Sequence, residues 1–291
     1  MARITGKTLP QKKQAILYIL SAAFFFALMN LFVKTAGDLP VWQKAMFRNL
    51  VALFIALGVV LREHTSLILK KGAGQWPALI TRCVAGSLGV FCNFYAIGRL
   101  NIADASMLNK LSPFFSILFS IAVLREKPSR REWAMVFLAF GGALFVIKPS
   151  FNMACVPAVI GLISGMGAGL SYTCVRKLGI QGVKGPVIVF YFSLFSCLAS
   201  IPGMVLTYQP MSAWQLISLL LAGASAAGGQ FSITAAYSRA PAKELSVFDY
   251  TQVIFAALMS LVILGDFPDG WSLVGYAIII GTAVYKWKSD Q

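Results

Sequence analysis

The chain has 291 residues, of which 58% are hydrophobic and 12% are charged. A soluble globular protein has about 45–50% apolar and about 25% charged residues, so a water-soluble fold of this size could not bury so much apolar surface. The formal net charge of +15 would suggest nucleic-acid binding in a soluble protein. In membrane proteins Lys and Arg instead collect in cytoplasmic loops, and we favour that interpretation over a nucleic-acid partner.

Apolar segments follow one another along the chain, each near the roughly 20 residues that span a bilayer. They cover residues 15–33, 41–61, 77–98, 103–124, 132–147, 155–175, 186–206, 213–237, 242–264 and 270–287. The fifth segment is short, and the eighth is rich in Ala, Gly and Ser, so these two are the weakest in the count. The sequence predicts an all-α membrane protein with ten transmembrane helices.

Positive charges fall on alternate sides of these segments. With a cytoplasmic N-terminus, the predicted inner loops and tails hold 18 Lys and Arg residues, and the outer loops hold only Lys34, Arg99 and Lys148. This is the distribution that the positive-inside rule describes. We therefore expect a multi-pass protein with both its N- and C-termini in the cytoplasm.

The two halves of the sequence align without gaps over several segments when one is shifted by 140 residues. Matches in this register include Arg99 with Arg239, Phe115 with Phe255, and Ser120 with Ser260. Each half holds five predicted helices, an odd number, so the second half enters the membrane inverted relative to the first. Inverted repeats can open to either side of the membrane around a site at its midplane, which favours a transporter.

Three stretches carry a family resemblance: FRNLVAL with Arg48, residues 94–126, and GGQFSITAAYSRAPAKELSVFDYTQVIFAALMSLVILGD. Over nearly its whole length the chain resembles the EamA-type transporters of the drug/metabolite transporter superfamily. The resemblance implies two inverted five-helix EamA repeats, at 15–148 and 155–288, after a cytoplasmic tail at 1–14. It also implies transport of small polar metabolites and a bacterial inner (plasma) membrane location.

Ionisable side chains within spans are costly in lipid and usually face the interior of the helix bundle. From the helical rise, Arg48 and Lys110 lie roughly 10 Å below the outer face of the membrane. Asn30, Asn93 and Asn109 fall in the same outer level. Together these side chains predict an electropositive, hydrogen-bonding level suited to a carboxylate or phosphate.

The inner half of the membrane has a different predicted character. Asp249 lies roughly 10 Å above the cytoplasmic end of its helix, and Gln252 lies one turn further on the same face. Tyr172 and Gln230 fall at a comparable depth. Tyr95 is a further candidate for substrate binding, by stacking, although aromatic side chains in membranes more often pack in the core.

Two interpretations of the buried charges stay open. In the first, Asp249 takes and releases a proton or holds a substrate ammonium, while Arg48 or Lys110 holds an anionic group. In the second they are structural: Arg48 braces neighbouring helices, and Lys110 pairs with Asp249 across the bundle. Lys44 and Arg82 lie closer to helix ends, so we expect both to extend towards the membrane interface.

We predict alternating-access transport of an amino-acid-like or carboxylate metabolite, by efflux or exchange, with proton or exchange coupling. The alternative is uptake of a cationic or zwitterionic compound, such as an S-adenosylmethionine-like molecule or a quaternary amine. A channel or lipid scramblase is a third possibility. Loss of binding in Arg48→Ala would support transport of the amino-acid-like or carboxylate metabolite, and loss in Asp249→Asn would support uptake of the cationic or zwitterionic compound.

The predicted spans lack the residue spacing of a metal site. They also lack the acidic cluster, His pair or Ser/Lys dyad that an intramembrane enzyme would need. We therefore expect no metal, no cofactor, no catalytic residues and no enzyme activity. A phosphate-binding P-loop is missing as well, which excludes direct ATP drive unless a separate subunit supplies it, and no ATPase subunit is implied. The expected partners are a small-molecule metabolite and membrane lipid, with the protein a monomer or homodimer.

Small residues indicate where helices approach closely. Gly161, Gly165 and Gly169 recur every four residues on the sixth predicted helix, a spacing that lets backbones meet. Pro113 lies within the fourth predicted helix, where it frees a backbone carbonyl. It is a candidate hinge or a static kink.

Overall fold

The computed structural model describes residues 11–69, 74–124, 129–147, 155–240, 245, 248–265 and 268–289, and most of them are helical. Lys148 and most of the predicted N-terminal tail, residues 1–10, lie outside these ranges. The helices are α1 (Gln11–Thr35), α2 (Val41–Arg62), α3 (Gln75–Arg99), α4 (Ile102–Asn109), α5 (Ser112–Val123), α6 (Arg130–Ile147), α7 (Val156–Ile180), α8 (Gly185–Thr207), α9 (Ala213–Arg239), α11 (Thr251–Met259), the π-helical turn η2 (Ser260–Leu264) and α12 (Gly270–Ser289).

Within the described residues, seven segments are long and apolar enough to cross a membrane. They are α1, α2, α3, the combined α4 and α5, α7, α8 and α9. Three shorter apolar helices, Trp133–Phe145, Thr251–Leu264 and Gly270–Thr282, coincide with the fifth, ninth and tenth predicted spans. The all-helical membrane fold is confirmed, while the count of ten spans stays a prediction.

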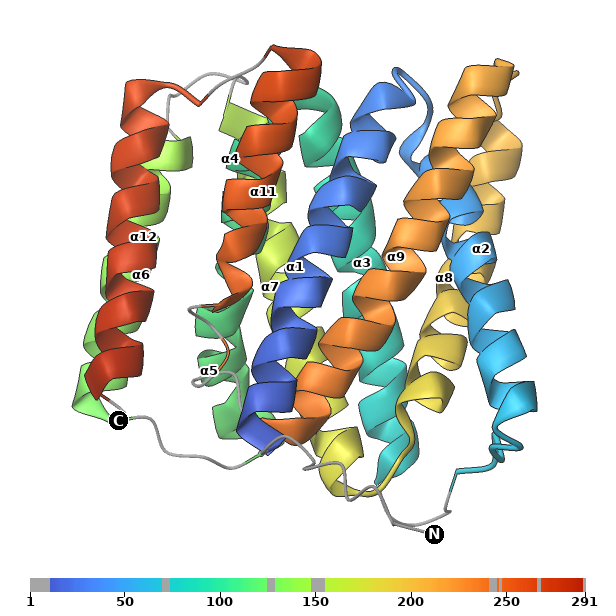
Figure 1. Ribbon diagram of the computed structural model, residues 1–291, viewed down its shortest axis with the longest axis horizontal. Coiled ribbons are helices and arrows are strands. Elements are labelled where there is room, and N and C mark those ends of the chain that lie inside the picture. The colour runs from blue at the N-terminus through green and yellow to red at the C-terminus, as the bar shows by residue number, and fades with distance from the viewer. Residues whose placement is uncertain are drawn as a thin grey trace, which may run out of the picture.

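Helix packing is reciprocal between the two halves of the chain. α1 packs along α9 and α3 along α7, while α5 contacts α7 and α11 contacts α1. α2 pairs with α8, and α6 pairs with α12, at opposite edges of the bundle (Figure 1). In the same view α1 begins and α12 ends at the same end of the bundle (Figure 1). This exchange of contacts fits the two-repeat pattern of the sequence.

The fourth predicted helix is broken near its middle. α4 ends at Asn109, Lys110 and Leu111 form a turn, and α5 begins at Ser112 with Pro113 in its first turn. Proline suits that position because a backbone N–H in the first turn has no partner within the helix. In the second half the chain turns at Tyr250 before α11 begins, and Tyr250 is the residue that aligns with Lys110.

These two turns correct the prediction of continuous helices over 103–124 and 242–264. Hydrophobic composition identifies a span but is insensitive to a turn of one or two residues within it. The breaks lie at matching positions of the repeat, so they are features of both halves.

α7 contacts the first break through its glycines. A Cβ placed on Gly165 would lie 2.5 Å from the carbonyl oxygen of Leu108, and one on Gly169 would lie 2.7 Å from that of Ser112. The α7 backbone is therefore held against the chain on both sides of the turn. This confirms the close approach that the glycine spacing predicts.

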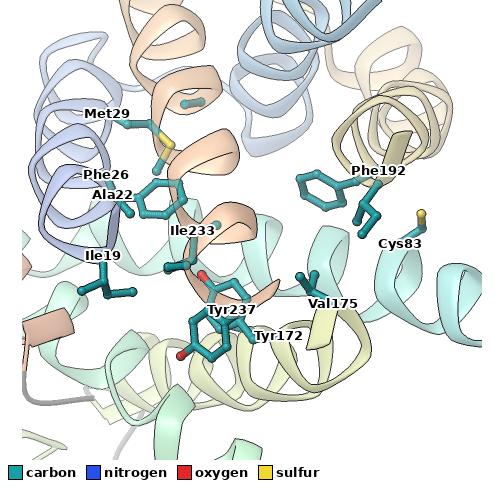
Figure 2. Close-up of a cluster of buried hydrophobic side chains, with 14 of the residues drawn as sticks. Ile19, Ala22, Phe26, Met29, Cys83, Tyr172, Val175, Phe192, Ile233 and Tyr237 are labelled. Carbon is teal, nitrogen blue, oxygen red and sulfur yellow. The ribbon is translucent and has the colours of Figure 1, made fainter. Parts of the chain in front are cut away.

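The largest hydrophobic cluster holds together the helices that surround the centre of the bundle. Phe26 and Met29 enter it from α1, and Phe192 enters from α8 (Figure 2). Tyr172 of α7 stacks on Tyr237 of α9, with ring centroids 4.9 Å apart (Figure 2). This core fixes the positions of α1, α7, α8 and α9 around the polar side chains between them.

We expect Gly165→Ala to destabilise the protein by about 1–3 kcal/mol, because the new methyl group would overlap backbone atoms. Gly58 of α2 provides a matched control, since a Cβ placed there would meet no atom within 4 Å. Gly58→Ala should be neutral or stabilise by up to about 1 kcal/mol through helix propensity. Thermal unfolding in detergent measures both, and equal stability of the two variants would contradict the close packing.

Candidate functional site

A cavity lies between α1, α2, α3, α7, α8 and α9, with Asn109 and Gln252 reaching it from the two helix breaks. About 520 Å³ of this space, its open part included, is not filled by atoms. The polar residues that line it are Asn30, Arg48, Arg82, Asn93, Asn109, Ser171, Tyr172, Gln230 and Gln252. Seven of the ten predicted site residues are among them; Tyr95, Lys110 and Asp249 are not.

Arg48 extends from α2 into this cavity and is 1% exposed. Its Nη1 donates a hydrogen bond to Oδ1 of Asn49. The Asn49 amide is held in turn, because its Nδ2 donates to the carbonyl of Ala45 at 2.8 Å and to Oγ of Ser196 at 2.7 Å. Nε of Arg48 has no hydrogen-bond partner among the described residues. Arg48 is therefore positioned by a neutral amide, and its Nε–H can still donate a hydrogen bond.

Arg82 also lines the cavity, and its expected place at the membrane interface is wrong. It is 1% exposed, with Nη1 donating to Oγ of Ser171 at 2.6 Å and Nη2 to Oε1 of Gln230 at 2.9 Å. Its guanidinium carbon lies 4.0 Å from the centre of the Phe192 ring. α3 begins at Gln75, so Arg82 lies about two turns inside the helix, where its guanidinium contacts α7, α8 and α9.

Lys44 departs from its predicted position, and Tyr95 lies outside the cavity lining. Lys44 is 4% exposed, so its side chain lies within the protein and does not extend to the surface. The Tyr95 ring faces the guanidinium of Arg99, 4.0 Å from ring centre to carbon, near the end of α3. Tyr95 therefore contacts a neighbouring helix-end arginine and lies outside the cavity lining.

Neither cavity arginine has a described carboxylate within 4.0 Å. Among the described acidic side chains only Asp104 and Asp249 are buried. Asp104 accepts a hydrogen bond from Tyr276 at 2.7 Å, and Asp249 pairs with Lys110. Removing an ion from water costs several kcal/mol unless an opposite charge or hydrogen bonds offset it. The described lining therefore carries two positive charges that only neutral groups contact.

Amide side chains supply the other polar atoms of the cavity. Nδ2 of Asn93 donates to Oδ1 of Asn30 at 3.3 Å, and Nδ2 of Asn30 donates to Oγ of Ser106 at 3.2 Å. Oδ1 of Asn93 and Oε1 of Gln252 are buried without a described partner. The lining can thus accept hydrogen bonds from a ligand as well as neutralise its negative charge.

Lys110 and Asp249 form a buried ion pair, with Nζ 2.6 Å from Oδ1 and exposed fractions of 1% and 0%. Their predicted separation into outer and inner levels of the membrane is wrong, whereas the alternative of a pair across the bundle is confirmed. The depth estimate fails because it assumes a continuous helix at each position. Instead Lys110 lies in the first helix break and Asp249 directly before the second.

The cavity also contains residues that sequence reasoning missed, namely Arg82, Ser171 and Phe192. The sequence did contain one indication that Arg82 is buried in the bundle: Gly86 follows it by four residues, on the same helix face. A Cβ on Gly86 would meet Nη1 of Arg82, the Phe192 ring at 2.9 Å and Oγ of Ser171 at 3.0 Å. The missing side chain at Gly86 leaves the space that the guanidinium occupies.

Comparison with known proteins gives consistent matches along the chain. The EamA-like transporter family matches residues 13–148 and 157–285. The pseudopaline exporter CntI of Pseudomonas aeruginosa UCBPP-PA14 is 32% identical over 271 residues, covering 92% of this chain and 94% of the relative. Human solute carrier family 35 member G1 is 25% identical over 313 residues, covering 98% of this chain and 83% of the relative.

One crystal structure of a protein superimposes with a TM-score of 0.71 at 15% sequence identity. The match covers 96% of this chain and 99% of that chain. At this identity the likeness establishes the fold alone, and it extends over almost all of the helical bundle.

We expect each single change in the buried ion pair, Lys110→Met or Asp249→Leu, to destabilise the protein by about 3–5 kcal/mol. Each leaves the other charge buried without its partner. The double variant should regain most of the loss, because both charges are then gone. Unfolding of the four proteins gives the coupling energy, with exposed Arg62→Gln as a control near zero. Additive losses would contradict a direct pair.

Proposed function

The chain belongs to the EamA-like transporter family, and on that premise we propose that it carries a small anionic metabolite across the membrane. The substrate class is an amino-acid-like or carboxylate compound, and the direction is efflux or exchange. The observation that carries the proposal is the pair of buried arginines in one cavity, without a described carboxylate beside them. One relative is named an exporter, which supports the outward direction.

The arginine side chains favour an anion over the other metabolite classes. A guanidinium presents a planar set of donors that matches carboxylate and phosphate oxygens, often with two parallel hydrogen bonds. The described lining contains no acidic side chain that would hold an ammonium or quaternary amine. The cationic-substrate alternative therefore lacks a counter-ion in this cavity, because Asp249 is engaged by Lys110.

In the proposed arrangement ten spans form two inverted repeats, at 15–148 and 155–288, behind a cytoplasmic tail at 1–14. Both termini face the cytoplasm of a bacterium, and the membrane is the inner (plasma) membrane. The charge distribution along the sequence and the reciprocal helix contacts support this topology. The protein acts as a monomer or homodimer.

In this proposal Asp249 couples transport to protons. Its carboxylate is ion-paired with Lys110, and this contact joins a helix break of one half to a break of the other. Protonation of Asp249 would neutralise it and remove most of the Coulomb attraction. The two breaks could then separate, which is the kind of movement between repeats that alternating access requires.

Arg48→Ala should weaken binding of the transported anion at least about tenfold, because it removes charge-assisted hydrogen bonds worth roughly 1.5–3 kcal/mol. Titration calorimetry of the purified protein measures the change, and exposed Arg62→Gln serves as the matched control. Unchanged anion affinity in Arg48→Ala would contradict the proposed site.

Asp249→Asn should leave anion affinity within about threefold of the wild type and make the transport rate independent of pH. The amide cannot exchange a proton in the physiological range, and it lies outside the cavity lining. Uptake into proteoliposomes across a pH series tests this. A pH profile like that of the wild type would refute the coupling role, and loss of all binding would favour a cationic substrate held by Asp249.

A further inference from the structure

We propose that the transported anion carries two negative charges and that Arg82 is its second anchor, an inference that rests on the proposed function. Arg48 and Arg82 approach the cavity from different helices, α2 and α3. Both lie beside the same ring, with guanidinium carbons 5.9 Å and 4.0 Å from the centre of Phe192. A ligand in this space meets both cations.

Three helices fix the orientation of Arg82. Ser171 of α7 and Gln230 of α9 accept hydrogen bonds from its two Nη atoms, and Phe192 of α8 lies against its guanidinium plane. These partners are neutral, so they orient the guanidinium without offsetting its charge. A neutral donor would bridge the same groups without the cost of burying an ion. A role that only braces the helices therefore does not explain why the side chain at position 82 is positively charged.

We infer the number of negative charges on the ligand from the number of positive charges in the described lining. Two like charges near one ring repel each other, and a low-dielectric interior strengthens that repulsion. A monoanion would neutralise only one of them. A dianion neutralises both, and the described lining offers no acidic side chain that would repel it.

The space around Arg82 is matched to its guanidinium. Gly86 lies one turn further along α3, and a Cβ there would meet Arg82, Phe192 and Ser171. Gly86→Ala would therefore displace the Arg82 guanidinium while retaining its charge. This variant therefore tests whether binding depends on the position of the Arg82 guanidinium and not only on its charge.

Two kinds of ligand supply two charges: a compound with two carboxylates, or a phosphate monoester with both charges on one group. Both match guanidinium donors. Matched pairs distinguish them: glutarate against glutaramate and succinate against succinamate for the first, methyl phosphate against dimethyl phosphate for the second. In each pair the members are similar in size and differ by one negative charge.

The experiment is calorimetric titration of the purified full chain in lipid nanodiscs with these six compounds. For at least one pair, the dianion should bind the wild type about tenfold or more tightly than the monoanion. Arg82→Gln should reduce that ratio to nearly one, with the monoanion affected less than about threefold. Gly86→Ala should lower the ratio with the charge still present, and Arg82→Lys should retain part of it. Exposed Arg99→Gln on the same helix is the control.

Each outcome decides one of the two claims. Equal affinity for both members of every pair, or a ratio that persists in Arg82→Gln and Gly86→Ala, would overturn the two-charge inference while leaving an anion site at Arg48. Should Arg82→Gln fail to fold, the ratios in Arg82→Lys and Gly86→Ala decide the matter. Failure of all six compounds to bind the wild type, or anion binding that survives Arg48→Ala, would overturn the proposed function itself.

Discussion

A charge buried within a helical membrane bundle costs several kcal/mol unless something offsets it, and the centre of this protein follows from how each buried charge is met. Lys110 and Asp249 meet one another at 2.6 Å. Arg48 and Arg82 meet only neutral amides, a hydroxyl and an aromatic ring. The charges of the first pair offset each other, although Oδ2 of Asp249 is buried without a described partner. The second pair carries two positive charges that no described carboxylate offsets. This difference separates a contact between the two halves from the proposed ligand site.

The two regions are close in structure because α7 takes part in both. Gly165 and Gly169 hold it against the break between α4 and α5, and Ser171 and Tyr172 from the next turn reach the cavity. α3 packs along the same helix and carries Arg82. A change at the break would therefore act on a helix that also positions a cavity residue. Physical contiguity of this kind permits coupling, and coupling itself requires measurement.

The sequence predicted most of the architecture because lipid restricts what a spanning segment can be. Apolar length located the helices, and the reciprocal packing of the halves fits the 140-residue repeat. Arg48, Asn93 and Gln230 were found because polar groups within spans face the bundle interior. These predictions rest on composition and residue spacing, so they hold even though the turns within the helices were not predicted.

What could not be predicted depends on local backbone geometry. Lys110 and Asp249 were placed at different depths because both were assigned to continuous helices. Arg82 was assigned to the interface from its distance to the helix end, which does not reveal that Ser171 and Gln230 accept hydrogen bonds from it. Such small errors change which side chains meet, even where every helix is correctly located.

A cavity that selects negative charge should distinguish ligands by their charge in a thermal-shift screen of the purified wild-type protein. A ligand at a hundredfold excess over its dissociation constant stabilises the folded state by about 2.7 kcal/mol. Carboxylates or phosphate monoesters should raise the unfolding temperature, and organic cations of similar size should not. Stabilisation by organic cations alone would contradict this selectivity.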